Sequence, residues 1–375
     1  MSYLSVPAVT VIMPSYNHAR FIAMAIESVL NQTFSNFELI IIDDGSSDDS
    51  VEIVKTFEDS RIRTVFLESN EGAAAALNRG VSLARGNYIA LCNSDDCWVE
   101  NKLDVQLSIF KEQPDLAATF SDVIWIDDRG TALDKSRLSF STRLFRRKNR
   151  SRHEWLHDLI LNGNCLCHPS IMIRRESLNR TDPYDNRLRQ LPDFQKWIAL
   201  VQFGEIFVSA EQLVKFRIHD TNTSAVKPDT SRRDANEFRL IIRSAFFNMS
   251  AENFSASFGL KSPPLVSETH LKIEKALFLI SYKGRLEYIF REAGLDLMYE
   301  LLASDETRLL LSTKYGYDIN SFYSDMGASS PWVDDTGFSV GGKINLTTVP
   351  TRRLAGQILK RGLKFLESQL KRPLK

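Results

Sequence analysis

The sequence predicts an α/β protein whose first part is a parallel sheet covered by helices on both faces. Three observations lead to this prediction. Over residues 1–130, short apolar runs alternate with segments whose apolar residues recur at helical spacing. The runs are apolar throughout, as expected of strands that are buried on both faces of a parallel sheet. Helical patterning then dominates residues 232–303, which predicts a mainly helical C-terminal extension.

The elements of the first part can be placed in chain order. The first strand is rich in β-branched residues and stops at Pro14, and the fourth helix stops before Pro114. The second helix begins with Ser and Asp residues, which suit an N-cap. The expected strands are residues 8–14, 37–44, 62–68, 87–93 and 117–128. The expected helices are residues 18–32, 46–59, 72–84 and 99–113.

Charge and composition narrow the class of protein. The 375 residues have no net charge, but residues 1–130 carry 20 acidic and 9 basic side chains. An acidic first part argues against a nucleic-acid-binding protein and suits a site that recruits a cation. The sequence has neither a secretory signal nor a run of about 18 apolar residues that would span a membrane. Its four cysteines fit no disulfide framework, so we expect a cytoplasmic protein with free thiols.

Polar clusters follow the first four expected strands, namely "PSYN", "DDGSSDD", "ESNEG" and "NSDD". Each alone is typical of a turn, but the carboxyl ends of parallel strands share one edge of the sheet, where ligands bind. In the last cluster Asp95 and Asp96 are adjacent, and two neighbouring negative charges repel each other unless a cation lies beside them. Carboxylates without nearby Cys or His residues suit Mg²⁺ or Mn²⁺, and these ions bring phosphate-bearing substrates.

Four stretches carry a resemblance to a known family. They are "VTVIMPSYNHARFIAMAIESVLNQTFSNFELIIIDDGSSDDS", "NEGAAAALNRGVSLARGNYIALCNSDD", "GNCLCHPSIMIRR" and "LPDFQKWIAL". In this order they resemble the family 2 glycosyltransferases, over roughly residues 8–224. The resemblance implies the GT-A fold of nucleotide-diphospho-sugar transferases, with a Rossmann-like, mixed and mainly parallel sheet. The implied first part is a GT-A domain at 1–224, which has a nucleotide-sugar-binding half at 1–130 and an acceptor-binding half at 131–224. A mainly helical extension at 225–345 and a basic amphipathic helix at 346–375 follow it.

The resemblance also implies a reaction and its residues. The protein would be a metal-dependent, inverting glycosyltransferase that moves a sugar from a nucleotide-sugar, with UDP as the nucleotide, to a hydroxyl of a glycan or lipid-linked acceptor. Such a reaction would belong to surface polysaccharide or glycoconjugate assembly. The implied nucleotide-binding residues are Pro14, Tyr16, Asn17, Asp44, Asn78 and Asp95. Asp96 would be the direct ligand of Mg²⁺ or Mn²⁺, His219 would approach the metal or the diphosphate, and His168 would contact the acceptor.

The resemblance places the general base at Asp193. Inverting transfer is a single displacement, so a carboxylate must take the proton of the attacking hydroxyl on the face opposite the leaving diphosphate. Asp193 also stands at an expected helix start, where it could instead be an N-cap. Asn93 stands where the family commonly has Asp, and Pro192 stands where it has Glu or Gly. These departures leave open a nucleotide-sugar-binding protein with impaired catalysis.

Two other motifs suggest different properties. "HEWLH" matches the zinc hydrolase pattern, with His153 and His157 as ligands and Glu154 as base. Near the end of the chain, "TRRLAGQILKRGLKFLESQLKRPLK" sets apolar residues on one helical face flanked by Arg and Lys. That pattern is typical of a helix that lies on an anionic membrane, although a helix that packs on its own protein would also show it.

Overall fold

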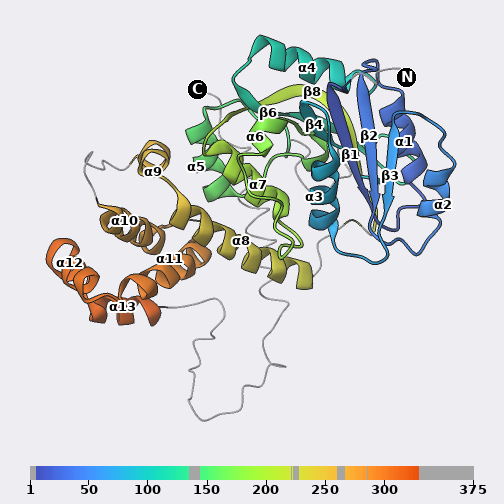
Figure 1. The fold of residues 1–375 in the computed structure, drawn as a ribbon. Helices are drawn as coiled ribbons and strands as arrows, with labels where there is room; N and C mark the ends of the chain where they lie inside the picture. The colour runs from blue at the N-terminus through green and yellow to red at the C-terminus, as the bar shows by residue number, and fades with distance from the viewer. Residues whose placement is uncertain are drawn as a thin grey trace, which may run out of the picture. The chain divides into compact units, whose positions relative to one another are not determined.

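The computed structural model describes residues 6–134, 144–220, 222, 228–259, 267–284 and 286–328. The chain divides into two compact units, Met1–Ala225 and Val226–Lys375. The first unit contains a sheet with helices around it, and the described part of the second unit is helical (Figure 1). The basic amphipathic helix expected at 346–375 lies outside the described residues.

Among the described residues, the first unit is built on an eight-stranded sheet of order β3-β2-β1-β4-β7-β6-β8-β5. Its strands are β1 (Val9–Ser15), β2 (Phe37–Asp43), β3 (Ile62–Phe66), β4 (Tyr88–Leu91), β5 (Cys97–Trp98), β6 (Leu116–Ile126), β7 (Met172–Arg174) and β8 (Glu205–Arg217). Strand β7 is antiparallel to β4 and β6, and β5 is antiparallel to β8. All other pairs are parallel. The predicted fold class, α/β with a mixed and mainly parallel sheet, is confirmed.

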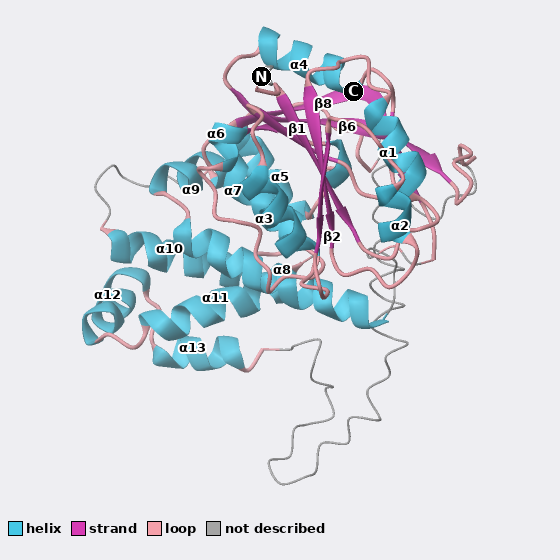
Figure 2. Cartoon of the chain, turned by 45° about the vertical axis from the view of Figure 1, so that its right-hand side comes forward, coloured by secondary structure: helices cyan, strands magenta, loops and turns pink. Residues whose placement is uncertain are grey.

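Helices lie on both sides of the sheet of the first unit, as Figure 2 shows. In the first unit they are α1 (Ile22–Leu30), α2 (Ser50–Lys55), α3 (Ala73–Leu83), α4 (Lys102–Glu112), α5 (Arg152–Asn162), the 3₁₀ turn His168–Ser170, α6 (Arg175–Leu178) and α7 (Pro192–Val201). In the second unit they are α8 (Pro228–Asn248), α9 (Ala251–Phe258), α10 (Glu268–Ser281), α11 (Glu287–Leu301), α12 (Asp305–Tyr315) and α13 (Ile319–Met326). Across the described ranges, we find no helix with the length and apolar character needed to cross a bilayer.

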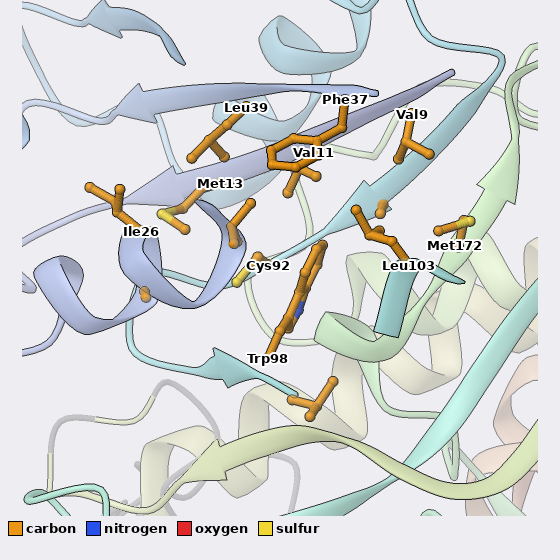
Figure 3. Close-up of a cluster of buried hydrophobic side chains, with 14 of the residues drawn as sticks. Val9, Val11, Met13, Ile26, Phe37, Leu39, Cys92, Trp98, Leu103 and Met172 are labelled. Carbon is orange, nitrogen blue, oxygen red and sulfur yellow. The ribbon is translucent and has the colours of Figure 1, made fainter. Parts of the chain in front are cut away.

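The two faces of the sheet bury separate apolar clusters. Val11 and Leu39 belong to a large cluster that also contains the buried residues of α1 (Figure 3). Ile40 and Ile42 point to the other face of β2, where they pack with Ala76 of α3. Each fully buried aliphatic side chain contributes about 1.5–3 kcal/mol to stability, so these strands are held firmly. The loops that follow the strands therefore start from fixed positions.

A buried carboxylate joins the amino ends of β1 and β2. Glu38 is 3% exposed at its side chain and accepts hydrogen bonds from Thr10 Oγ1 at 2.7 Å and from Arg63 at 3.0 Å. Arg85 adds its backbone N–H at 2.8 Å and its Nε at 2.9 Å. Gly86 lies so close to β1 that a Cβ there would stand 2.4 Å from the backbone nitrogen of Thr10. Every oxygen of this buried acid thus has partners.

Candidate functional site

The loop after β1 is hydrogen-bonded to the loop after β2. The backbone N–H of Asn17 donates to Ser46 Oγ at 2.9 Å, and the Asn17 side chain accepts from the N–H of Ser47 at 2.8 Å. The N–H of His18 donates to Ser50 Oγ at 3.0 Å. Asn17 has a φ of 53°, in the left-handed region that Asn tolerates better than most residues. The side chain of Asn17, predicted to bind the nucleotide, therefore shapes the loop that carries His18.

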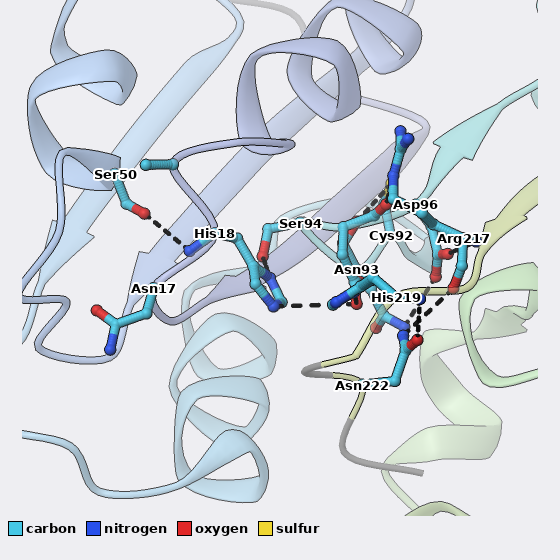
Figure 4. Close-up of polar contacts among 12 residues, drawn as sticks. Asn17, His18, Ser50, Cys92, Asn93, Ser94, Asp96, Arg217, His219 and Asn222 are labelled. Atoms are coloured by element: carbon cyan, nitrogen blue, oxygen red, sulfur yellow. Dashed lines mark hydrogen bonds and ion pairs between the residues drawn. The ribbon is translucent and has the colours of Figure 1, made fainter. Parts of the chain in front are cut away.

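Two imidazoles and one carboxylate meet at the carboxyl end of β4. His219 Nε2 lies 3.1 Å from Asp95 Oδ2, and His18 Nε2 lies 3.9 Å from the same oxygen. The other ring nitrogen of His18 is hydrogen-bonded to Ser94 Oγ at 2.8 Å (Figure 4). The three candidate ligand atoms all lie within 4.8 Å of one another. Within the described ranges this is the only such group of three or more His, Cys, Asp or Glu residues.

The electrostatics of this group suit a cation. Burial by itself raises the pKa of Asp95, but the hydrogen bond with His219 and the neighbouring His18 outweigh burial and lower the pKa below its usual value. Burial lowers the pKa of His18, and the attraction of Asp95 opposes this only in part. At neutral pH the carboxylate is therefore charged and the His18 imidazole neutral. Those are the protonation states that metal ligands need.

Asp96 is the residue that was predicted to be the direct metal ligand. One of its oxygens accepts the backbone N–H of Arg217 at 2.8 Å, and the other accepts from Asn93 Nδ2 at 3.1 Å (Figure 4). Its burial and the nearby charge of Asp95 raise its pKa well above the ordinary value. Asp96 thus holds the "NSDD" loop to the end of β8, and the structure brings Asp95, rather than Asp96, to His219.

Asn93 has a physical role in this loop. Its amide N–H₂ supplies a donor to the buried carboxylate of Asp96. An Asp at this position would have no such donor when ionised and would place a further negative charge beside Asp96. The departure from the common family pattern at Asn93 is therefore matched to the burial of Asp96.

Arg217 was not predicted from the sequence. Its side chain is fully buried, and its Nε donates to the backbone oxygen of Asp95 at 2.7 Å. One terminal nitrogen donates to the backbone oxygens of Asp127 and Asp128 at 2.8 and 3.0 Å. Arg217 thereby joins the "NSDD" loop to the loop after β6. Its position two residues before His219 was the signal available in the sequence.

The predicted nucleotide-binding residues at the ends of β1 and β2 differ in how exposed they are. Tyr16 is 44% exposed, and Pro14 is half-buried. The carboxylate of Asp44 is buried and accepts the N–H groups of Glu71 and Gly72 at 2.8 and 2.9 Å. Its burial raises its pKa, although these two hydrogen bonds act in the opposite direction. The ring of Tyr16 is thus accessible to a ligand, whereas Asp44 also holds the start of α3.

Asn78, another predicted nucleotide-binding residue, uses its side chain within the protein. Its Oδ1 accepts the N–H of Tyr184 at 2.8 Å, and its Nδ2 donates to the backbone oxygen of Tyr184 at 2.8 Å. A further bond of 3.2 Å reaches Asn186. Asn78 therefore fixes the segment that leads towards α7.

The predicted base Asp193 lies in the first turn of α7. Pro192 is the first residue of that helix, a position that suits Pro, and the N-cap is Leu191 rather than Asp193. Asp193 accepts the N–H of Phe194 at 2.7 Å and the side-chain amide of Asn164 at 2.9 Å. Burial raises the pKa of Asp193, and His168 together with these hydrogen bonds opposes that rise. A carboxylate with a raised pKa is a better proton acceptor near neutral pH.

His168, the predicted acceptor contact, is beside Asp193. Its ring centroid lies 5.8 Å from that of Trp197 and 6.2 Å from that of Tyr184. Burial lowers the pKa of His168, while the charge of Asp193 raises it. The His168 Nε2 atom is buried and makes no hydrogen bond among the described residues. The structure therefore brings Asn164, His168 and Asp193 together from segments far apart in the chain.

The "HEWLH" segment forms the first turns of α5. Glu154 forms a capping box with Ser151, which is the N-cap of this helix. The Glu154 side chain accepts the Ser151 N–H at 2.9 Å. The group of possible metal ligands in the described residues contains neither His153 nor His157. A helix-capping role accounts for Glu154, and the zinc hydrolase alternative has no support in this part of the chain.

Comparisons with known proteins identify the family. The model described as "Glycosyl transferase family 2" matches residues 10–181. Over 243 residues the chain is 32% identical to TuaG of Bacillus subtilis, a glycosyltransferase assigned to teichuronic acid biosynthesis. This match covers 64% of the chain and 90% of TuaG. The chain belongs to glycosyltransferase family 2. It is a glycosyltransferase, as the sequence predicted.

Other family 2 relatives and solved structures are consistent with this assignment. WfgD of Escherichia coli, named UDP-Glc:alpha-D-GlcNAc-diphosphoundecaprenol beta-1,3-glucosyltransferase, is 46% identical over 101 residues, which are 27% of the chain and 40% of WfgD. The fold resembles residues 1–349 of Staphylococcus aureus TarS in complex with UDP-GlcNAc, with a TM-score of 0.54, 16% identity, and coverage of 84% of the chain and 87% of that TarS fragment. It also resembles the mannosyltransferase PcManGT of Pyrobaculum calidifontis in complex with GDP-Man and Mn²⁺. The TM-score is 0.51 and the identity 15%, and the match covers 83% of the chain and 80% of PcManGT. These two likenesses support the GT-A fold.

Proposed function

We propose that this glycosyltransferase transfers a sugar from a UDP-sugar to an acceptor hydroxyl, with inversion at the anomeric carbon and with the help of a divalent cation. The observation that carries the proposal is the meeting of Asp95 and His219 at the carboxyl end of β4. A carboxylate and an imidazole at hydrogen-bond distance, at the ligand-binding edge of a mainly parallel sheet, suit a cation that brings a diphosphate. The UDP-GlcNAc complex of TarS and the UDP-Glc donor in the name of WfgD favour uridine as the nucleotide.

The residues present fit Mn²⁺ or Mg²⁺. Asp95 supplies a charged oxygen ligand and His219 a nitrogen ligand, and the fold neighbour PcManGT was solved with Mn²⁺. When bound, the cation would stabilise the negative charge that grows on the leaving diphosphate. Arg217 holds the backbone of Asp95 in place, and Asp96 keeps the "NSDD" loop on β8. We propose that these two residues act by positioning the ligands.

The nucleotide would lie over the loops after β1 and β2. The exposed ring of Tyr16, next to Pro14, can stack on a flat base. Asp44 has two oxygens that each accept one backbone N–H, which leaves lone pairs for the imide N–H of uracil. Asn17 and Asn78 would act by shaping the loop after β1 and the 184–186 segment, rather than by direct contact with the nucleotide.

Asp193 would be the general base. The acceptor oxygen attacks the anomeric carbon, the bond from that carbon to the diphosphate breaks, and the hydroxyl proton passes to the Asp193 carboxylate. Asn164 fixes one Asp193 oxygen, and His168, which lies beside Asp193, would contact the acceptor. We place the acceptor among glycans or lipid-linked glycans of a surface polysaccharide or glycoconjugate, because TuaG is assigned to teichuronic acid synthesis and the name of WfgD includes a diphosphoundecaprenol sugar.

A binding protein with impaired catalysis is the second candidate. It was suggested by Asn93 and Pro192, but both residues have favourable roles here. Asn93 donates to buried Asp96, and Pro192 occupies the first position of a helix. These roles favour an active enzyme.

Asp193→Asn tests the proposed reaction. With Mn²⁺, a UDP-sugar and a panel of lipid-linked acceptors, we expect wild-type protein to release UDP and form a glycosylated product. The variant should lose on the order of 10²–10⁴-fold in transfer rate, because an amide cannot accept the proton. UDP should still raise the melting temperature of the variant, because ligand binding to the folded protein stabilises it by mass action.

Asp115→Asn is the matched control, since Asp115 is exposed at the turn after α4. Full transfer activity in Asp193→Asn would contradict its role as base. If wild-type protein bound UDP-sugars but transferred nothing to any acceptor, the second candidate would be favoured.

A further inference from the structure

We propose that His18 is a third protein ligand of the divalent cation, so that two imidazole nitrogens and one carboxylate oxygen hold the metal. The inference rests on the proposed function in one respect, namely that a cation binds beside Asp95. It adds a ligand from the loop after β1, which joins the metal to the loop that also carries Tyr16. The metal and nucleotide sites would then share one structural element.

The distances fit three ligands of one ion. Ligand atoms about 2.1 Å from a metal, at right angles to each other, are about 3 Å apart. His219 Nε2 and Asp95 Oδ2 are 3.1 Å apart, and His18 Nε2 and the same oxygen are 3.9 Å apart. All three atoms lie within 4.8 Å of one another. Small side-chain adjustments therefore bring the three atoms to metal-binding spacing.

The His18 ring is oriented for this role. Its Nδ1 is hydrogen-bonded to Ser94 Oγ at 2.8 Å, and this bond turns Nε2 towards Asp95. Metal-binding imidazoles almost always use their other nitrogen in such a bond, which fixes the tautomer and the ring plane. The backbone N–H of His18 is bound to Ser50, and its ring meets that of His219 edge-on at 5.9 Å (Figure 4). His18 and His219 thus approach Asp95 from different loops.

A direct hydrogen bond to Asp95 accounts for the position of the His18 ring less well than a shared cation does. At 3.9 Å, Nε2 of His18 is beyond hydrogen-bond length from Asp95 Oδ2, whereas His219 lies within it. If Nδ1 donates its proton to Ser94, Nε2 presents a lone pair to a carboxylate oxygen. Two acceptors that face each other at this distance are stabilised by a cation between them.

The set of ligands has a consequence for metal choice. Mg²⁺ takes mainly oxygen ligands, whereas imidazole nitrogen suits transition metals. With two nitrogens, the site should bind Mn²⁺ or Co²⁺ more tightly than Mg²⁺. With His219 as the sole nitrogen ligand, that difference should be smaller.

Pulsed electron paramagnetic resonance of Mn²⁺ bound to the full chain tests the ligand set directly. We expect ¹⁴N couplings from two imidazoles in wild-type protein, both with Mn²⁺ alone and with Mn²⁺ plus UDP. His18→Gln should retain one imidazole coupling and lose on the order of 10–100-fold in Mn²⁺ affinity. His270→Gln, which alters a half-buried histidine hydrogen-bonded to Ser267 in the second unit, should keep the wild-type spectrum and affinity.

The outcomes separate the inference from the proposed function. A single imidazole coupling in wild-type protein, or an unchanged Mn²⁺ affinity in His18→Gln, would overturn the inference even if sugar transfer is metal-dependent. Two couplings in a protein that transfers no sugar would support the inference and count against the proposed function. The wild-type spectrum is decisive by itself, so the test stands even if a variant folds poorly.

Discussion

The two ends of the central strands carry acidic side chains in different surroundings. At the amino end, Glu38 is surrounded by donors from Thr10, Arg63 and Arg85, and its charge is balanced within the protein. At the carboxyl end, Asp95 faces two imidazoles while a second acid, Asp96, is buried next to it. The same strands thus hold one end where a buried carboxylate is bound by protein donors at both oxygens, and one end where two neighbouring acids lie beside two imidazoles and the buried guanidinium of Arg217.

This difference indicates which end serves stability and which serves function. A buried carboxylate with complete hydrogen bonding lowers the free energy of the folded state relative to one left unpaired. Two neighbouring acids instead repel each other, and a bound cation would reduce that repulsion. Substitutions at the two ends should therefore have different effects. Those at Asp95 should lower activity, and those at Glu38 should lower stability.

The largest effect is expected for Asp95→Asn. Loss of the charged ligand should lower kcat/KM on the order of 10²–10³-fold, comparable to the removal of one transition-state-stabilising group. The free energy of unfolding should change by no more than about 1 kcal/mol, because the amide oxygen can still accept from His219. Steady-state kinetics with Mn²⁺ and denaturant unfolding measure the two quantities. Wild-type activity in this variant would remove Asp95 from the cation site.

Glu38→Gln should show the reverse pattern. The amide places N–H groups where arginine donors now point, so we expect a loss of about 2 kcal/mol in the free energy of unfolding of the first unit. The kcat/KM should stay within about twofold of wild type, because Glu38 lies at the opposite edge of the sheet. Urea unfolding followed by tryptophan fluorescence reports the stability. A large loss of kcat/KM in folded Glu38→Gln would contradict the view that the amino end serves stability and the carboxyl end serves activity.

The pH dependence of stability, measured for wild type and for Glu38→Gln, provides the control. Burial by itself raises the pKa of Glu38, but hydrogen bonds from Arg85, Thr10 and Arg63 outweigh it and lower the pKa from 4.5. The stabilisation from a lowered folded-state pKa is complete above the unfolded-state value and disappears as the pH falls through the folded-state value. Wild type should therefore lose its advantage over Glu38→Gln as the pH falls below about 4.5. A difference that persists at lower pH would mean that packing, not charge, holds Glu38.

The central strands were predicted from the sequence, and the site only in part. Apolar runs placed β1 and β2 within a residue or two, because strands that are buried on both faces leave little ambiguity. The two-residue β5 and the antiparallel β7 were not predicted, since their pairing depends on contacts distant in the chain.

The same limit applies to the site residues. Local motifs drew attention to Asp95, Asp96 and His219, but not to which acid faces the imidazole. That choice depends on the backbone N–H of Arg217, 121 residues further along the chain, which binds Asp96 and leaves Asp95 to His219. His18 was missed because its partner Ser94 lies 76 residues away. A sequence pattern gives residue types at strand ends, whereas the orientation of each side chain comes from tertiary hydrogen bonds.

The smallest expected effect concerns a third acid, the half-buried Asp193. Burial raises its pKa, and the hydrogen bond from Asn164 opposes that rise. Asn164→Ala removes a donor that favours the charged form, so the pKa of Asp193 should rise further. Because the base must be ionised to accept a proton, the acid limb of the pH profile of kcat/KM should move to higher pH, with little change at the plateau. Asn162→Ala alters a residue two positions before Asn164 and removes a hydrogen bond to Asp158, so it should leave the profile unchanged. An acid limb that moved to lower pH, or did not move, would show that the rate does not depend on ionised Asp193.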